Sequence, residues 1–295
     1  MERLSQNKKN SEGKKGNLYK LVLYDIRAGF RSNLVKLTAF TVLCVFICIM
    51  GVRAISGVAE TQNLKPTIMD YICYMVGGPK HIPPAMLDIY VIPVLWLSLQ
   101  VMIAYVAGYY AVTDLHTYGQ QILIRSNSRL KWWLSKCIWN IVTVVFMYGI
   151  IYVTSFATAF FAGAEFKNRL TPEIVMSVCN INMVGGNTKE IAIILFLMPV
   201  FTSIALSMAQ MTIALITSPI IGFIASQSIV FLSTIYEYKF LISNYAMLSH
   251  NKITCMSQIE YREGIVINLL VFGFAIVTGL LYFKRCNILP KNQEI

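Results

Sequence analysis

The chain has 295 residues, of which 56% are hydrophobic and 13% are charged, and its mean hydropathy is +0.61. A soluble domain carries about 25% charged residues, so this composition excludes an ordinary soluble enzyme and indicates a polytopic membrane protein. The net charge of +11 comes from Lys and Arg beside apolar segments, where such residues orient a chain and contact anionic lipid. We therefore expect the lipid bilayer, and no nucleic acid, as the partner of this charge.

The N-terminal region is first polar and then amphipathic. Residues 1–16 indicate a disordered basic tail. Residues 17–36 are expected to form an amphipathic helix in the cytoplasmic interface of the membrane. Apolar residues up to Phe30 follow the spacing of one helical face, while Lys20, Arg27 and Arg31 lie off that face. A solvated linker beside the membrane is the alternative interpretation.

Six apolar runs predict an all-α polytopic domain over residues 37–283, followed by a cytoplasmic tail at 284–295. The six runs are 37–55, 87–112, 137–164, 191–216, 219–236 and 264–283. As one helix, the fourth and fifth runs would measure about 70 Å, over twice the thickness of the hydrocarbon layer. The chain is therefore expected to reverse at Thr217-Ser218-Pro219, because proline disfavours a continued helix.

The distribution of Lys and Arg predicts the orientation of this domain. Sixteen of these residues lie before the first run, between the second and third runs, or after the sixth, and eight lie in the segments opposite. Arg53, at the end of the first run, completes the set of 25. Because Lys and Arg are retained on the cytoplasmic side, both termini are expected in the cytoplasm.

The sequence lacks the residue motifs that several kinds of enzyme require. There is no HExxH, no CxxC and no GxxxxGKS/T, so neither a zinc protease nor a Walker-type ATPase is expected. We expect no catalytic residue, no metal and no cofactor in this chain. The six predicted spans contain no ionisable residue near mid-membrane, which argues against an ion-coupled carrier.

Uncharged polar side chains within the predicted spans are candidates for a translocation path. Gln100 and Tyr105 in the second span and Gln227 in the fifth could line a route for an amphipathic solute. Hydrogen bonding between helices is the alternative explanation for such residues, and each bond of that kind contributes about 1 kcal/mol.

Seven cysteines exclude a complete disulfide framework, since the number is odd. Cys44 and Cys48 are one helical turn apart in the first span and are expected to be packing residues. Cys73, Cys179 and Cys255 are all expected outside the cell, where one pair could form. The sequence leaves open whether any of them pair.

The order of these elements resembles the permease subunits of ATP-binding cassette exporters of the type-two family. The segment YGQQILIRSNSRLKWWLSK, residues Tyr118–Lys136, is similar to that family's first cytoplasmic loop, with a helix that contacts the ATPase and a basic, aromatic entry into the third span. The ending YFKRCNIL, Tyr282–Leu289, is similar to the family's basic tails. The resemblance extends over the chain after Gly16 and depends largely on topology.

The resemblance implies a permease that pairs with a second permease copy, identical or related, and binds a cytosolic ATPase subunit that holds ATP and Mg. An apolar ridge with a neighbouring arginine also suits a groove with an acidic rim on a partner. The residues assigned to the ATPase contact are Tyr118, Gly119, Gln120, Gln121, Ile122, Leu123, Ile124 and Arg125.

The family's exporters carry antimicrobial peptides, drugs, lipids or polysaccharides. By analogy, the small size of this chain implies a bacterial plasma-membrane permease for peptide export or self-protection, with a substrate that the sequence does not identify. The alternative function is a membrane-embedded sensor or scaffold without transport activity.

Overall fold

The computed structural model of the chain describes residues 18–79, 91–115, 129–183, 187–254 and 259–285. These residues form helices and one isolated bridge, between Thr67 and Glu165, and no strand. The elements are α2 (Leu18–Ser32), α3 (Leu34–Gln62), α4 (Ile68–Val76), α5 (Val94–Leu115), α7 (Arg129–Phe161), α8 (Pro172–Cys179), α9 (Thr188–Ala192), η2 (Ile193–Leu197), α10 (Met198–Ile216), α11 (Pro219–Ser233), η3 (Ile242–Ala246), η4 (Leu248–His250) and α12 (Tyr261–Arg285).

Five helical segments of the described chain are long and apolar enough to cross a membrane, namely α3, α5, α7, the continuous segment Thr188–Ile216, and α12. They confirm the prediction of an all-helical membrane protein. The fifth predicted span forms α11, whose 15 residues measure about 22 Å and fall short of a hydrocarbon layer of about 30 Å. A sixth crossing and the cytoplasmic location of both termini stay predictions.

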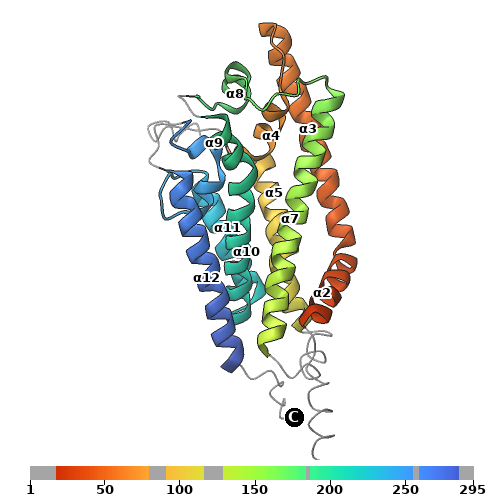
Figure 1. Cartoon of the computed structure of the whole chain (residues 1–295), viewed down its shortest axis with the longest axis vertical. Helices are drawn as coiled ribbons and strands as arrows, with labels where there is room; N and C mark the ends of the chain where they lie inside the picture. Colours follow the sequence, from red (N-terminus) through yellow and green to blue (C-terminus); the bar gives the residue numbers. More distant parts are fainter. Residues whose placement is uncertain (1–17, 80–90, 116–128, 184–186, 255–258, 286–295) are drawn as a thin grey trace, which may run out of the picture.

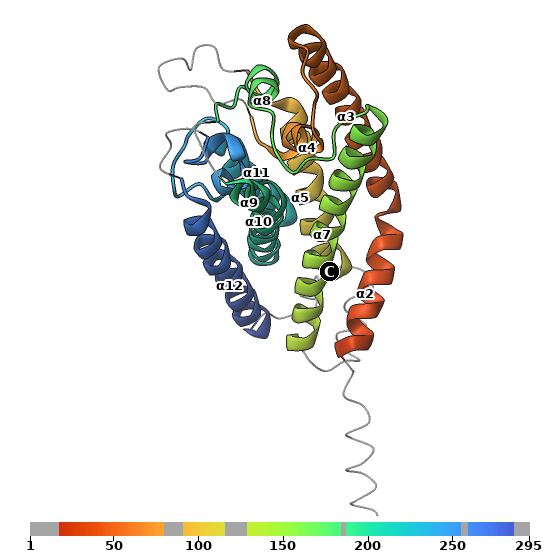
Figure 2. The same cartoon turned by 45° about the horizontal axis from the view of Figure 1, so that its top comes forward.

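The helices form a bundle in which α10 is central. α10 packs against α5, α7, α11 and α12, and α7 contacts α2, α3 and α4 (Figure 1). Figure 2 shows α12 and α3 on opposite sides of the bundle, with α10 and α7 between them. Because the sequence places apolar residues all around these helices, their inner faces form the core while their outer faces leave large apolar side chains exposed.

The two ends of the bundle are built differently. α2, the start of α7 and the end of α12 lie at one end, and α4 and α8 lie at the other (Figure 1). At the first end the Arg129 guanidinium donates hydrogen bonds to the carbonyl oxygens of Phe283 and Lys284, at 3.1 and 2.9 Å. These bonds join the start of α7 to the last turn of α12 and satisfy carbonyls that a helix end leaves free.

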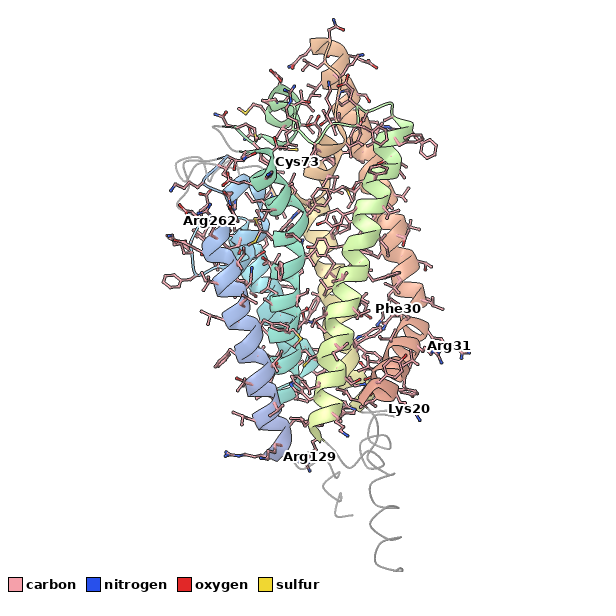
Figure 3. All side chains as sticks on the ribbon, viewed as in Figure 1. Lys20, Phe30, Arg31, Cys73, Arg129 and Arg262 are labelled. Atoms are coloured by element: carbon pink, nitrogen blue, oxygen red, sulfur yellow. The ribbon has the colours of Figure 1, made fainter. Side chains whose placement is uncertain are left out.

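α2 packs against α7 through a narrow face. Gly29 is buried there, and a Cβ atom at this position would overlap the Trp139 ring. Phe30 turns toward α7, where its ring meets Trp139 edge-on at a centroid distance of 5.2 Å. Lys20 and Arg31 point away from the bundle (Figure 3). The amphipathic pattern thus separates a face packed on protein from a charged, exposed face, while the position of α2 at a membrane interface stays a prediction.

The fourth candidate span contains a π-helical segment, Ile193–Leu197, immediately before α10. Pro199 has no backbone N–H and leaves a carbonyl of the preceding turn without its helical partner. The Tyr152 hydroxyl from α7 lies 3.0 Å from the carbonyl oxygens of both Leu195 and Phe196. A side chain of the neighbouring helix therefore satisfies the backbone at this irregular turn, as an apolar environment requires.

We predict that Gly279→Ala destabilises the contact between α7 and α12. A Cβ at Gly279 would overlap the Trp133 ring, and overpacking of this kind costs about 1–3 kcal/mol. Gly273→Ala is the matched control on the same helix, because a Cβ there meets nothing within 4 Å. Thermal unfolding in detergent should show a lower midpoint for Gly279→Ala alone. Equal midpoints for the two variants would contradict the close packing.

Candidate functional site

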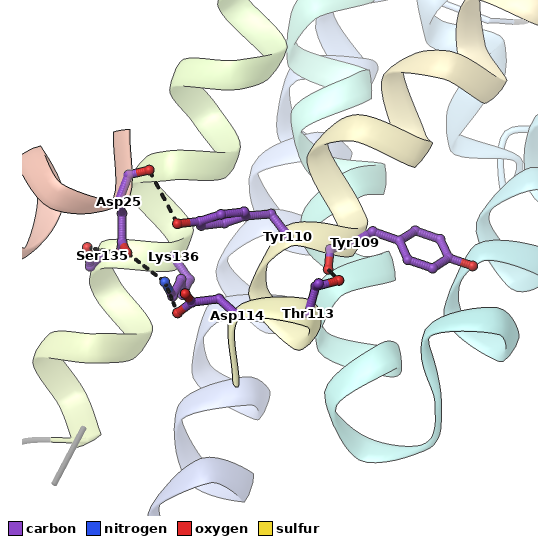
Figure 4. A network of polar contacts seen from close by, with 7 residues as sticks. All are labelled: Asp25, Tyr109, Tyr110, Thr113, Asp114, Ser135 and Lys136. Carbon is purple, nitrogen blue, oxygen red and sulfur yellow. Dashed lines mark hydrogen bonds and ion pairs between the residues drawn. The ribbon is translucent and has the colours of Figure 1, made fainter. Parts of the chain in front are cut away.

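Three charged side chains from three helices meet inside the bundle near the end that holds α2. The Lys136 ammonium of α7 lies 2.7 Å from a carboxylate oxygen of Asp25 in α2 and 2.6 Å from one of Asp114 in α5 (Figure 4). Ser135 donates a further hydrogen bond of 2.5 Å to the second carboxylate oxygen of Asp25. We call Asp25, Asp114 and Lys136 the charged triad.

The triad is withdrawn from solvent. The side chains of Lys136 and Asp25 are 0% and 1% exposed, and that of Asp114 is 8% exposed. Aromatic rings complete the enclosure, because the Lys136 ammonium lies 4.7 Å from the centre of the Tyr110 ring and 5.1 Å from that of Trp132. Buried charges are tolerated only when they are paired and hydrogen-bonded, and Lys136 meets that condition with two carboxylates and two ring faces.

The net charge of the triad favours the protonation of one of its two carboxylates. Two carboxylates and one ammonium sum to −1 when all three are ionised. Burial raises the pKa of Asp25, the contacts with Lys136 and Ser135 oppose that rise, and the charge of Asp114 adds to it. Protonation of Asp25 brings the triad to neutrality, and its carboxyl can then share a hydrogen bond with Ser135.

Two members of the triad lie on the helices that precede and follow one segment of the chain, between α5 and α7. Asp114 lies in the last turn of α5, and Lys136 lies in the first third of α7. The segment between these two helices contains residues 118–125, the predicted ATPase contact. All eight of those residues fall outside the described part of the chain, so the expectation that they form a helix in contact with an ATPase stays a prediction.

A cluster of uncharged polar groups joins α5, α7 and α10 deeper in the bundle. The Tyr148 hydroxyl lies 2.8 Å from Ser203 Oγ and accepts a hydrogen bond of 3.4 Å from Gln100 Nε2. Ser203 Oγ lies 3.5 Å from Gln100 Oε1. Gln100, one of the predicted path-lining residues, is therefore hydrogen-bonded to two neighbouring helices within the single chain.

A second polar cluster joins α5, α10 and α11. Gln210 donates to the Ala104 carbonyl at 3.1 Å and accepts from Ser226 Oγ at 2.9 Å. Gln227 lies beside it, with its amide nitrogen 3.5 Å from Ser226 Oγ. Gln100 and Gln227 line one cavity between these helices, with a volume of about 20 Å³, enough for about one water molecule.

Tyr105 lies apart from that cavity. Its side chain is 38% exposed on the outer surface of α5, where its ring meets Tyr109 at a centroid distance of 5.3 Å. The Lys36 ammonium lies 4.4 Å from the centre of the Tyr105 ring. The structure thus brings two of the three predicted path-lining residues together and leaves the third on the surface.

The charged triad was not predicted from the sequence, and its three residues lie outside the six predicted spans, so the expectation of no ionisable residue near mid-membrane is not contradicted. Asp114 and Lys136 lie just outside the predicted apolar runs, but the helices α5 and α7 continue through them and bury them. Asp25 did give a signal, since it lies one turn before Gly29 on the apolar face of α2. A carboxylate on such a face requires a buried partner.

Searches against protein-family models, curated proteins and solved structures return no match to this chain.

We predict that Lys136→Met lowers the free energy of unfolding by about 3–5 kcal/mol, because it leaves the buried acidic groups of Asp25 and Asp114 without their counter-charge. The triple variant Asp25→Asn, Asp114→Asn, Lys136→Met should recover much of that loss, since it removes all three charges together. Lys20→Met, an exposed lysine of α2, is the control and should change little. Thermal unfolding in detergent compares the stability of the three variants. If the triple variant were destabilised as much as Lys136→Met, the explanation from unpaired buried charge would be contradicted.

We also predict that Asp25 makes stability depend on pH. Its folded pKa is raised above the ordinary value of 3.8, so its contribution is fully present below that value and is lost as pH rises through the raised pKa. Lys136 and Ser135 from α7, and Asp114 and Tyr110 from α5, are the groups that face it. Unfolding midpoints from pH 4 upward should decline in the wild type and less in Asp25→Asn; parallel curves would contradict the prediction.

Proposed function

We propose that this chain is the permease subunit of an ATP-binding cassette exporter, with six membrane crossings and both termini in the cytoplasm of a bacterial cell. It would act with a second permease copy and a cytosolic ATPase subunit that binds ATP and Mg. The five candidate spans, the abundance of Lys and Arg in the segments predicted to be cytoplasmic, and the resemblance in residues 118–136 support this proposal.

The charged triad is the observation that carries the proposal. An exporter driven by a separate ATPase must pass a displacement from its cytoplasmic loop to its helices. The ion pair of Asp114 with Lys136 joins α5 to α7, the two helices that flank the predicted ATPase contact. The ion pair of Asp25 with Lys136 joins α2 to α7. Separating these groups would leave a buried charge without a partner, so the three helices respond to a force on the loop as one unit.

The polar clusters support a path that opens by helix movement. The cavity beside Gln100 and Gln227 holds about 20 Å³ and cannot admit a peptide or a drug-sized molecule in this conformation. Its walls come from α5, α10 and α11, and their polar groups are hydrogen-bonded to one another. Rearrangement of these helices would expose the amides of Gln100 and Gln227 to a substrate, whose class we take to be an amphipathic peptide, drug or lipid.

A proton-coupled carrier is the second candidate function, and the charged triad also favours it. Buried acidic residues that pair with a lysine inside a helical bundle are typical of proton relays in membranes. Asp25, with its raised pKa, would be the proton-carrying group. A carrier of this kind would transport substrate in liposomes under a pH gradient without any ATPase.

We predict that replacing Ile122, Leu123 and Ile124 by glutamate abolishes co-purification of a cytosolic ATPase in mild detergent, because charge on the apolar ridge prevents its burial in a partner groove. Glutamate at Ser126, Asn127 and Ser128 is the matched control, since it adds the same charge to the same loop outside the assigned contact. Mass spectrometry and ATP hydrolysis measure binding. We further expect Lys136→Met complexes to retain the ATPase and lose substrate-stimulated hydrolysis.

Retention of the ATPase by the triple-glutamate variant would contradict the assigned contact. Absence of any ATPase from intact wild-type protein in several detergents would contradict the exporter proposal. Uptake driven by a pH gradient in liposomes would then favour the carrier. Without such uptake, a sensor or scaffold that recruits another partner would be the remaining interpretation.

A further inference from the structure

At the end of the bundle opposite the charged triad, α4 and α8 are fastened together by a buried carboxylate. Asp70, 1% exposed, accepts hydrogen bonds of 2.8 Å from the backbone N–H of Thr67 and from that of Thr171. These two residues are the N-caps of α4 and α8, so a single side chain satisfies donors at two helix starts. The Thr67 hydroxyl also donates to the Arg169 carbonyl at 2.7 Å.

Backbone contacts reinforce this attachment. The Ile68 amide donates to the Glu165 carbonyl at 3.2 Å, and the Glu165 amide donates to the Pro66 carbonyl at 2.9 Å. α4 and α8 are more than ninety positions apart in the sequence, yet polar groups hold their starts in one register. Side chains that follow on the facing surfaces of these helices therefore have a fixed separation.

Two cysteines meet across this contact. Cys73 lies one turn after Asp70 on α4 and is 1% exposed, whereas Cys179 is the last residue of α8 and is partly exposed. Their thiols are hydrogen-bonding neighbours. Both are free thiols in the structure. Figure 3 shows Cys73 at the end of the bundle near α8.

We propose that Cys73 and Cys179 are a disulfide-forming pair that locks α4 to α8 on the outer face of the membrane. The oxidant is a small-molecule or protein disulfide of the extracytoplasmic space. The Cys179 thiolate, which is accessible, attacks that disulfide and releases one thiol. The Cys73 thiolate then attacks the Cys179 sulfur and releases the second thiol, so that one dithiol is oxidised, one disulfide is reduced and both protons leave with the released thiols.

Cys179 also borders an apolar groove. Tyr74 and Met75 of α4 and Val178 and Cys179 of α8 line a cavity of about 520 Å³, together with residues at the start of α5. The disulfide would tie the α4 wall of this groove to its α8 wall. A closed ring of about one hundred residues also restricts the unfolded chain, and such a ring stabilises the folded state. Oxidation would therefore limit how far the ends of α3 and α7, which lead into α4 and α8, can separate.

Peptide mapping of the wild-type protein tests the pair directly. Trypsin releases residues 54–80 and 170–189, each of which contains one cysteine, Cys73 or Cys179. After incubation of detergent-purified protein with oxidised glutathione, a cross-linked species of these two peptides, lighter by two hydrogens than their sum, is the expected result. The peptide with Cys44 and Cys48 is the internal control, because cysteines four apart on one helix have Cβ atoms too distant for a disulfide.

The oxidised protein should unfold several degrees above the reduced protein, and the midpoint of Cys179→Ser should not respond to oxidant or reductant. Failure to form the 54–80 to 170–189 cross-link with oxidised glutathione would overturn the proposal. The outer location depends on the proposed topology and is tested separately. A disulfide in purified protein, combined with no disulfide in cells and no labelling of Cys179 by a membrane-impermeant maleimide, would support the pair and contradict the topology.

Discussion

The cytoplasmic half of the proposed exporter depends on one ammonium group held between two carboxylates. Lys136 is buried away from solvent with Asp25 and Asp114, so the positions of α2, α5 and α7 are tied to one another by the requirement that no buried charge lose its partner. This constraint differs from apolar packing, which tolerates sliding of one helix along another. It makes the three helices a single body at the end of the bundle where an energy-supplying partner would act.

Elsewhere in the bundle the same requirement is met by uncharged groups. Tyr152 bonds to the carbonyl that Pro199 leaves without its helical partner, and Gln210 bonds to both α5 and α11. Bonds of this kind are individually weak, about 1 kcal/mol each, and can be exchanged for others. The bundle thus has buried ion pairs at one end and the hydrogen bonds of Asp70 at the other, with exchangeable polar contacts between them. This arrangement is suited to movement of the helices at the centre.

Parts of this structure were accessible to sequence reasoning because they depend on local rules. α10 ends at Ile216 and α11 begins at Pro219, with Ser218 accepting a hydrogen bond from the Ile221 amide, as proline and a capping residue require. The exposed position of Lys20 and Arg31 follows from helical spacing in the same way. The length of α11 was not accessible, since the helix ends at Ser233 while the apolar run continues.

The sequence by itself determined that the chain is helical and membrane-embedded, because apolar content and helical period are properties of consecutive residues. Only the tertiary structure decided that Asp25, Asp114 and Lys136 share one site, that Gln100 and Gln227 line one cavity while Tyr105 does not, and that Cys73 meets Cys179. The physical reason is that a charge or thiol acquires its role from a partner on another helix. Residue spacing along the chain carries no information about which helices become neighbours.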